Sequence, residues 1–384
     1  MSLRSSRRAL AVRHSPIRSM TIECEKLGGI NLAQGVCDTP VPEVVRRAAQ
    51  AAIEEGANTY SRYDGLEELR VALATKMKRD NGLEYAAEGE ILVTSGATGA
   101  FYVAAVALLE PGDEVVLFEP YYGYHLDTLR VLDVEPIFVR LAAPDWSFEP
   151  ADLEAVITPR TRAVVINTPA NPSGKVWSAV ELRELGRVAE RNELFLLTDE
   201  VYEHFVFDGT RHVSPAGLPG LRERTITMNA LSKTFAVTGW RIGWVAADLR
   251  WASLFGPLND LVYVCPPTPL QLGAARALGQ LGPEFYAGIG GEYEQKRDRL
   301  CAALEHAGLE PYIPQGSYFT LADISRLPGD TGEERTMHLL HETGVAAVPG
   351  EAFYHGPEGW DVARFCFGKT DEDLDLACRR LEKL

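Results

Sequence analysis

Lys233 is the residue whose surroundings carry the clearest chemical signal. It lies in Asn229-Ala-Leu-Ser-Lys-Thr-Phe-Ala-Val-Thr-Gly-Trp-Arg-Ile-Gly243, after an apolar run that predicts a buried strand. Lysines are mostly solvated at protein surfaces, so apolar neighbours on both sides are informative. Burial lowers the pKa of a lysine and favours the neutral amine that Schiff-base chemistry requires. We therefore predict that Lys233 is a reactive amine in an active site.

Other polar groups follow predicted strands in the same part of the chain. Asp199 and Tyr202 come at the end of one apolar strand, Asn171 shortly after another, and Tyr122 after a third, while residues 93–100 join a strand to a helix through small residues. In an open parallel sheet, ligand-binding groups gather at the carboxyl ends of the strands. Taken singly, these signals are weak, because Asn-Pro-Ser-Gly is only a turn and an isolated aspartate is often a helix cap.

The order of these motifs resembles that of the class I and II aminotransferases, which are fold type I pyridoxal-phosphate enzymes. The resemblance runs from about Ser15 to the C-terminus, and its most specific part is Ser-Lys-Thr-Phe-Ala-Val-Thr-Gly-Trp-Arg-Ile-Gly. It implies an enzyme that moves an amino group between an L-amino acid and a 2-oxo acid in a ping-pong cycle. The implied cofactor is pyridoxal 5'-phosphate, attached to Lys233 as a Schiff base, and no metal is implied.

The resemblance implies roles for the residues around the cofactor ring. Asp199 would pair with the protonated pyridine nitrogen, which keeps the ring cationic and able to accept electrons. Tyr202 and Asn171 would donate hydrogen bonds to the phenolic oxygen, and Tyr122 would stack on the ring. Lys233, freed by the substrate amine, would move a proton from the substrate α-carbon.

A second group of residues resembles the family's phosphate site. Small residues at a helix start let backbone N–H groups approach an anion, and the helix dipole favours it. The residues matching this cradle are Gly96, Ala97 and Thr98. Arg241 resembles the phosphate-binding arginine, whose planar fork suits phosphate. One departure is Ala230, where the family usually has Ser or Gly; either phosphate binding is weaker here or Ser232 compensates.

Three further residues are implied in substrate binding and assembly. Arg364 lies among apolar residues and would grip the substrate α-carboxylate, with a structural salt bridge as the alternative. Gly35 would bring its backbone beside that carboxylate, although Cys37 stands nearby where relatives often have Pro. Tyr60 would reach the cofactor phosphate of the opposite subunit, so the resemblance implies a homodimer.

The elements that must position these groups follow a strand and helix alternation. Seven apolar runs predict strands, at 91–94, 115–118, 137–141, 163–167, 194–198, 225–228 and 242–246, with helices at 97–109 and 179–191 among them. This βαβ pattern predicts an α/β fold with a mostly parallel central sheet flanked by helices. After Pro266, long helical stretches, strands at 316–322 and 364–367 and a helix at 333–343 predict a smaller α+β domain.

Length and composition limit the remaining possibilities. The 384 residues exceed one core, and we expect an N-terminal arm and part of the small domain at 1–44, a large cofactor-binding domain at 45–265 and a small C-terminal domain at 266–384. A net charge of −16 disfavours binding to nucleic acid or anionic membrane. The six cysteines form no metal or disulfide pattern. We expect a cytoplasmic protein, although the acid-free residues before Glu23 also fit the composition of a transit peptide.

Two other functions share this fold. The same residues could carry β-elimination, as in a C–S lyase, or other α-carbon chemistry. A ligand-binding domain of a transcription regulator would need a DNA-binding domain, and about thirty residues before Asn31 are too few for one. Aromatic segments at 121–124 and 263–267 fit an apolar or aromatic substrate, as in the kynurenine and methionine branch, whereas no residue can be assigned to a side-chain carboxylate from sequence.

Overall fold

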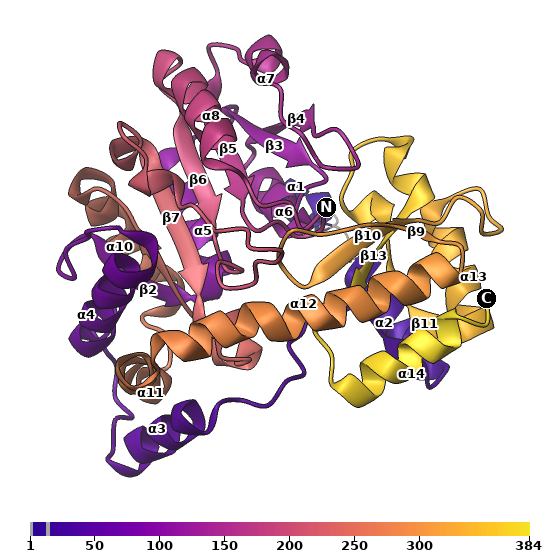
Figure 1. The fold of residues 1–384 in the computed structure, drawn as a ribbon. Helices are drawn as coiled ribbons and strands as arrows, with labels where there is room; N and C mark the ends of the chain where they lie inside the picture. The colour runs from indigo at the N-terminus through magenta and orange to yellow at the C-terminus, as the bar shows by residue number, and fades with distance from the viewer. Residues whose placement is uncertain (1–2, 13–15) are drawn as a thin grey trace.

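A seven-stranded sheet forms the centre of the protein in the computed structural model, which describes residues 3–12 and 16–384 (Figure 1). Its strands are β2 (Ile91–Ser95), β3 (Glu114–Glu119), β4 (Glu135–Arg140), β5 (Thr161–Asn167), β6 (Phe195–Asp199), β7 (Thr225–Ala230) and β8 (Ile242–Ala246). Their order is β2-β8-β7-β6-β5-β3-β4, and β8 runs antiparallel to both of its neighbours. The predicted α/β fold and all seven predicted strands are confirmed.

Helices cover both faces of this sheet. They are α5 (Gly96–Leu108), α6 (Gly123–Val131), α7 (Pro150–Val156), α8 (Ala179–Arg191), the short α9 (Leu231–Thr234) and α10 (Leu249–Tyr263). Helix α8 begins with a capping box, in which Ser178 and Glu181 exchange hydrogen bonds, as its sequence pattern predicts. Strands β3, β7 and β8 are buried along their whole length, and β2, β5 and β6 nearly so, which is why they appear in the sequence as continuous apolar runs.

A smaller four-stranded sheet lies beside the first, in the order β12-β13-β10-β9. Its strands are β9 (Glu310–Tyr312), β10 (Phe319–Asp323), β12 (Val348–Pro349) and β13 (Val362–Cys366). The accompanying helices are α11 (Thr268–Gln280), α12 (Pro283–His306), α13 (Gly332–Thr343) and α14 (Asp371–Leu381), and α12 runs along both units (Figure 1). The strand predicted at 316–322 begins only at Phe319, because Ser317 has a φ of 64° and breaks the extended backbone.

The N-terminal part of the chain joins the two units. Its helices are α1 (Arg7–Ala11), α2 (Pro16–Lys26), α3 (Glu43–Glu54) and α4 (Glu67–Lys76). Strand β1 (Ile30–Asn31) pairs in parallel with β11 (Val345–Ala346), so the segment that follows β1 is anchored to the C-terminal unit. Helices α3 and α4 instead pack against α11. The domain boundaries at 44 and 265 stay a prediction, and Ser15 lies outside the described residues.

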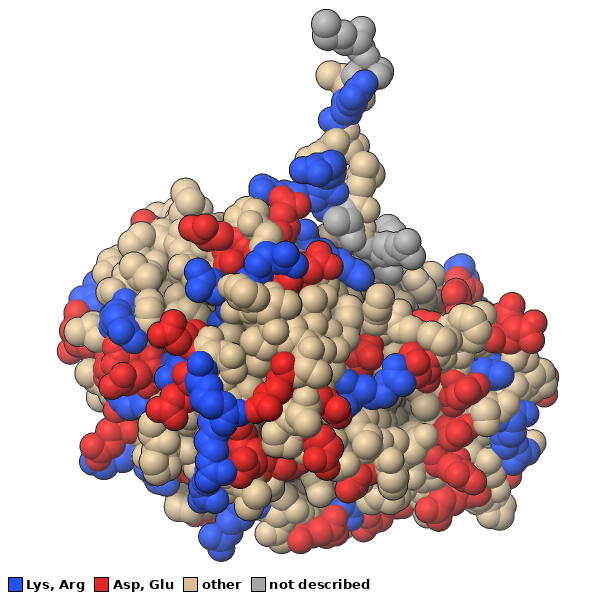
Figure 2. Space-filling view, turned by 90° about the horizontal axis from the view of Figure 1, so that it is seen from above, with Lys and Arg blue, Asp and Glu red and all other residues tan. Residues whose placement is uncertain are grey.

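The surface carries both charges intermixed on the face shown in Figure 2, from which the arginine-bearing N-terminal arm projects. Arg8 of this arm pairs with Asp133. All six cysteines are free, and five of them are buried. Within the described ranges, no helix combines the length and apolar character that crossing a membrane requires.

Candidate active site

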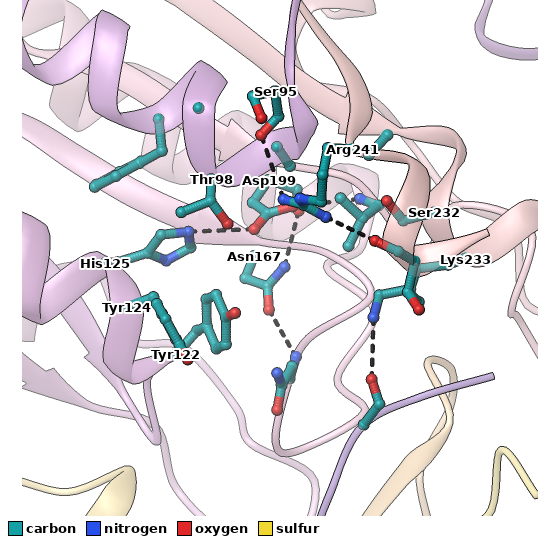
Figure 3. Close-up of a pocket in the computed structure, with 18 of the residues that line it drawn as sticks. Ser95, Thr98, Tyr122, Tyr124, His125, Asn167, Asp199, Ser232, Lys233 and Arg241 are labelled. Carbon is teal, nitrogen blue, oxygen red and sulfur yellow. Dashed lines mark hydrogen bonds and ion pairs between the residues drawn. The ribbon is translucent and has the colours of Figure 1, made fainter. Parts of the chain in front are cut away.

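A cavity of about 770 Å³ opens where β5, β6 and β7 end and α5 begins (Figure 3). Asn167, Asp199 and Ala230 are the last residues of those three strands, and Ser95 is the last residue of β2. Of the predicted site residues, the structure brings eleven together as lining of this cavity: Gly35, Ala97, Thr98, Tyr122, Asn171, Asp199, Tyr202, Ser232, Lys233, Arg241 and Arg364. The carboxyl edge of the sheet therefore gathers them, as strand polarity predicts.

Lys233 sits in α9, one turn of helix that begins directly after β7. Its side chain is half-buried and faces the cavity, and its Nζ donates a hydrogen bond to the carbonyl of Gly35 at 3.2 Å. No carboxylate pairs with it among the described residues. Burial lowers the pKa of Lys233 below its ordinary value of 10.5, which enlarges the fraction of neutral amine near physiological pH.

The carbonyl of Gly35 is shared between two donors. Besides Lys233, it accepts a hydrogen bond from the Tyr318 hydroxyl at 3.0 Å. Gly35 has to be glycine, because a Cβ there would lie 2.5 Å from the ring of Phe319. Cys37 closes the other side of the lysine through a contact of 3.6 Å from its Sγ to the Lys233 carbonyl, and burial raises the pKa of its thiol to about 11. The thiol is therefore an inert packing group.

Asp199 is buried, and the imidazole of His125 lies beside its carboxylate. The His125 Nε2 lies 3.2 Å from the Asp199 Oδ2, and the backbone carbonyl of Asp199 accepts from the Asn167 side chain at 2.9 Å (Figure 3). The imidazole is held between Phe101, with ring centroids 4.4 Å apart, and the edge of Tyr122 at 5.1 Å. The carboxylate is thereby oriented into the cavity from the end of β6.

Three predicted ring-binding residues lie around the same space. Burial, with the charge of Asp199 adding to it, raises the pKa of Tyr122, and burial raises that of Tyr202 well above its ordinary value, so both hydroxyls stay protonated donors. The Tyr122 ring stacks on Tyr124, with centroids 5.3 Å apart. The Asn171 backbone N–H donates to the Asn167 side chain at 2.6 Å, which fixes the turn that carries its amide.

Arg364 is a fully buried cation in the centre of β13. Its Nη1 donates to the Asn171 Oδ1 at 2.8 Å and its Nη2 to the Ala33 carbonyl at 2.6 Å, while its guanidinium lies 4.1 Å from the Phe319 ring centroid. Its Nε has no hydrogen-bond partner in the described chain, and no carboxylate pairs with the group there. Burial lowers the pKa of Arg364. A buried cation without an anion is costly, so the geometry calls for an anionic ligand.

The predicted phosphate cradle lies at the first turn of α5. Gly96 has a φ of 69°, its N–H donates to the Arg241 carbonyl at 3.1 Å, and the Arg241 guanidinium packs where a Gly96 side chain would be. Thus Gly96 shapes the cradle, whereas the next N–H groups, of Ala97 and Thr98, have no intrahelical acceptor. Arg241 donates to the carbonyls of Thr238 and Ser95, and the Ser232 hydroxyl is buried without a partner.

Tyr60 is the predicted residue that the structure keeps apart from the others. Its side chain is 83% exposed and does not line the cavity. Sequence reasoning also missed residues that do belong here, namely His125, Asn167, Tyr263 and Tyr318. His125 and Asn167 each follow a predicted strand, which was a usable signal, whereas Tyr318 is brought to Lys233 by a strand of the other sheet.

The charges lining the cavity are strongly unbalanced. Its cationic side chains are Arg18, Lys233, Arg241 and Arg364, and its only carboxylate in the described chain is Asp199. The whole protein, in contrast, has a net charge of −16. An excess of cations inside an acidic protein indicates a ligand that carries several negative charges.

Comparison with known proteins agrees with this geometry. The model of the family "Aminotransferase class I and II" matches residues 28–381. A probable N-succinyldiaminopimelate aminotransferase from Mycobacterium tuberculosis is 37% identical over 377 residues, which cover 95% of this chain and 94% of that protein. The methionine aminotransferase of Escherichia coli K12 is 34% identical and covered to 92%, as is this chain. The solved N-succinyldiaminopimelate aminotransferase structure superposes with a TM-score of 0.95 at 35% identity, over 99% of this chain and 100% of that one.

The family match and the solved relative, together with a lysine beside the carboxyl edge of a mostly parallel α/β sheet, identify a fold type I pyridoxal-phosphate enzyme. The chain belongs to the class I and II aminotransferases. It is a pyridoxal-phosphate-dependent aminotransferase, and the relatives reported above are named for transamination rather than elimination.

The residues present fit that cofactor. Two buried atoms at the cavity, Ser232 Oγ and Arg364 Nε, lack partners in the described chain and can bind anions. The cradle is also shaped for close approach, because a Cβ at Gly243 would lie 2.4 Å from the Gly96 backbone. Lys233 supplies an amine without a competing carboxylate. Phosphate, ring and carboxylate groups thus each find matching donors.

Proposed function

We propose that this aminotransferase works as a homodimer in which Lys233, Asp199 and Tyr202 carry the chemistry. The observation that supports the proposal most directly is the pair of cations, Lys233 and Arg364, that face one cavity without a carboxylate partner among the described residues. The activity converts an L-amino acid to its 2-oxo acid and then aminates a second 2-oxo acid. When bound, pyridoxal phosphate supplies a carbonyl carbon that accepts an amino group and a ring that withdraws electrons.

Lys233 holds the cofactor between turnovers and acts as the base once the substrate amine has displaced it. Its lowered pKa favours the neutral amine, which can take a proton from the substrate α-carbon and return it one atom away. The hydrogen bond to the Gly35 carbonyl orients the amine by using one of its N–H groups. Its lone pair is then left free for the proton.

Asp199 would hold a proton on the ring nitrogen, and its carboxylate is positioned by the His125 imidazole, whose Nε2 lies 3.2 Å from Oδ2. Tyr202 and Asn171 would donate to the phenolic oxygen, and Tyr122 would pack on the ring face. Because burial raises the pKa of both tyrosines, they stay protonated through the cycle. Ala97, Thr98, Ser232 and Arg241 hold the phosphate, in a cradle shaped by Gly96.

Arg364 holds the substrate α-carboxylate, with the Gly35 backbone beside it. Its Nη1 and Nη2 are already anchored to Asn171 and Ala33, and its Nε is unpaired, so the guanidinium is fixed in place before substrate binds. A preorganised cation loses little side-chain entropy on binding. The fixed guanidinium therefore orients the substrate so that its α-carbon faces Lys233.

Arg18 of α2 is the remaining cation of the cavity. Its side chain is exposed and forms no ion pair with any described residue, and Tyr124, Thr128 and Val262 line the same cavity. After the phosphate and the α-carboxylate are matched with Arg241 and Arg364, Arg18 is available for a further carboxylate. We therefore propose that one substrate of the pair has an acidic side chain, as the name of the Mycobacterium tuberculosis relative also suggests. An apolar or aromatic amino acid can be the other substrate.

A homodimer would bring Tyr60 to the phosphate of the neighbouring subunit. Its 83% exposure, with Leu261 beside the cavity mouth equally exposed, suits a surface that a second copy covers. Mixing Tyr60→Phe with Lys233→Ala chains tests this. If each site contains Lys233 of one chain and Tyr60 of the other, half of the sites in a mixed dimer contain neither change, and activity is regained. If each chain forms its own site, the mixture has only the average activity of the two variants.

The division into a domain of residues 45–265 and a smaller domain of 266–384, joined by residues 1–44, is part of the proposal. A cytoplasmic location is proposed as well, and the unpaired cysteines support it.

The function is tested by a panel of L-amino acids offered to the cofactor-loaded enzyme. Each is scored by the change of cofactor absorbance from the carbonyl to the amine form and by oxo-acid release. Lys233→Ala should lower turnover by about 10⁴-fold or more and remove the pH-dependent absorbance that attachment to lysine produces. Normal turnover in this variant would refute the assignment.

A further inference from the structure

Tyr263 is a cavity residue that the sequence analysis connected only with an apolar or aromatic substrate and gave no role at the cofactor. It is the last residue of α10, and its side chain lines the cavity. Its hydroxyl is buried and has no hydrogen-bond partner in the described part of the chain. A buried hydroxyl without a partner costs free energy, so its presence beside a ligand cavity needs a reason.

The hydroxyl lies against the first turn of α5. A Cβ added at Gly99 would be only 2.6 Å from the Tyr263 oxygen and 3.4 Å from the Ser95 side chain. Glycine at position 99 therefore makes room for the hydroxyl beside the N–H groups that begin the helix. Burial raises the pKa of Tyr263 to about 12, which keeps the group a proton donor, while the nearby backbone of Ser95 and the positive charge of Arg241 act in the opposite direction.

The backbone fixes this placement. Val264, the next residue, has φ of 60° and ψ of −65°, and the Cys265 N–H donates to the Tyr263 carbonyl at 2.6 Å. This is a γ-turn of the strained type, which is rare for a β-branched residue. The turn ends α10 at Tyr263, so the helix does not continue past the cavity and the tyrosine stays at the cavity wall.

The same phosphate cradle has no hydroxyl at position 230. Ala230 lines the cavity at the end of β7, where the family usually has Ser or Gly. The donors that remain are Ser232, Arg241 and the first-turn N–H groups of α5. Tyr263 approaches this group from α10, through its hydroxyl beside Gly99.

We propose that the Tyr263 hydroxyl donates a hydrogen bond to the cofactor phosphate and replaces the contact that Ala230 cannot make. The inference rests on the proposed function, since it takes the start of α5 as the phosphate site. Tyr263 is a binding residue in this proposal and takes no part in proton transfer at the substrate.

The experiment compares two ligands that differ only in the phosphate. The full-length chain is freed of cofactor by dialysis against an amine, and pyridoxal 5'-phosphate and pyridoxal are each titrated by absorbance. In Tyr263→Phe, the Kd for pyridoxal phosphate should rise about tenfold, as expected for one hydrogen bond to a charged group, while that for pyridoxal changes less than about twofold. The ³¹P resonance of the loaded variant should also shift from that of the unaltered protein.

Tyr85→Phe is the matched control. Its hydroxyl is also buried and unpartnered, but it does not line the cavity. This variant should leave both Kd values and the ³¹P resonance unchanged. Circular dichroism of all variants shows whether each is folded.

Arg241→Gln separates failure of this inference from failure of the proposed function. If Arg241→Gln weakens pyridoxal phosphate selectively but Tyr263→Phe does not, the Tyr263 contact is wrong and the phosphate site stands. If neither variant distinguishes the two ligands, the phosphate lies elsewhere and both proposals are overturned. Equal weakening of both ligands by Tyr263→Phe would assign the tyrosine to ring packing and would also overturn the inference.

Discussion

Lys76 and Lys233 both lie inside the fold, and their different partners distinguish a structural lysine from a functional one. Lys76 in α4 is 3% exposed, pairs with Glu203, and donates to the Asn81 side chain at 2.9 Å. Glu203 in turn accepts from Asn81 and from Asn229, each at 2.7 Å. Lys233 is also largely desolvated, but it donates its hydrogen bond to the Gly35 carbonyl. The polar groups around Lys76 pair with one another, whereas Lys233 faces a cavity.

The difference teaches where to look for a ligand in such a protein. Burial acts on both carboxylate and amine, but the outcome depends on the neighbours. Burial alone would raise the pKa of Glu203, yet Lys76, together with His204 and His212, outweighs it and holds that pKa well below 4.5. At Lys233 and Arg364, burial dominates and lowers the pKa. A cation that stays unpaired inside the fold is therefore kept for an anion or a reaction.

The largest effect is expected from replacing Arg364, which lines the cavity beside Lys233. Arg364→Met should lower kcat/KM by about 100-fold or more, because a desolvated carboxylate contact is lost. In the absence of substrate, its free energy of unfolding should change by less than about 1 kcal/mol, because the desolvation cost of the unpaired cation offsets the two hydrogen bonds that Arg364 donates. Steady-state kinetics and urea unfolding measure the two quantities. Strong destabilisation would mean that Arg364 serves the fold.

Removing Lys76 should give the opposite result. Lys76→Met leaves Glu203 buried without its cation, and the free energy of unfolding should fall by about 3–5 kcal/mol. Any folded fraction should still attach the cofactor and show its visible absorbance. Unfolding followed by circular dichroism, with Arg364→Met in parallel, makes the comparison direct. A variant as stable as the unaltered protein would remove the contrast between the two lysines.

The pH dependence of the Lys76 pair has a definite sign. Because the folded pKa of Glu203 lies below its ordinary value of 4.5, the pair stabilises the protein above that pH, and the contribution declines as pH falls below it. The stability gap between the unaltered chain and Lys76→Met should accordingly narrow as pH falls, and the narrowing should begin above pH 4.5, because burial without Lys76 raises the pKa of Glu203 in the variant. Urea unfolding at several pH values measures this gap. A gap that widens in acid would contradict the sign.

Lysine reactivity gives a smaller but more local test. In the cofactor-free chain, labelling of Lys233 by an amine reagent should be half-maximal below pH 10.5, because burial lowers its pKa. Lys78 is the control, since its hydrogen bond to Glu84 raises the pKa above the same ordinary value. Mass spectrometry of the two peptides, after labelling at a series of pH values, shows which amine has the lower pH of half-maximal labelling. The reverse order would exclude a neutral Lys233.

The smallest expected effect concerns Arg18. Its position at the rim keeps it in contact with solvent, so Arg18→Ala should raise the KM for dicarboxylic substrates by about three- to fivefold. The KM for methionine should stay unchanged. Equal changes for both substrates would assign Arg18 to the closing of the cavity rather than to side-chain recognition.

Much of the fold and the site followed from local sequence. The strands before Asn167, Asp199 and Lys233 were predictable, because continuous apolar runs of this length are buried on both faces of a parallel sheet. Strand polarity then predicted that the residues at their ends share one edge. Residue types at these ends, together with the family resemblance, indicated which groups meet the cofactor.

The rest depended on contacts between distant parts of the chain. The sequence could not pair Tyr318 with Gly35, from which it is separated by 283 residues, nor bring Tyr263 against Gly99. It also could not tell that Arg364 lacks a carboxylate, since 54 acidic residues were available to pair with it. By itself the sequence determined which residues end each strand, because that depends on neighbouring positions. Only the tertiary structure decided which buried charges are satisfied, because that depends on the packing of segments that sequence does not place side by side.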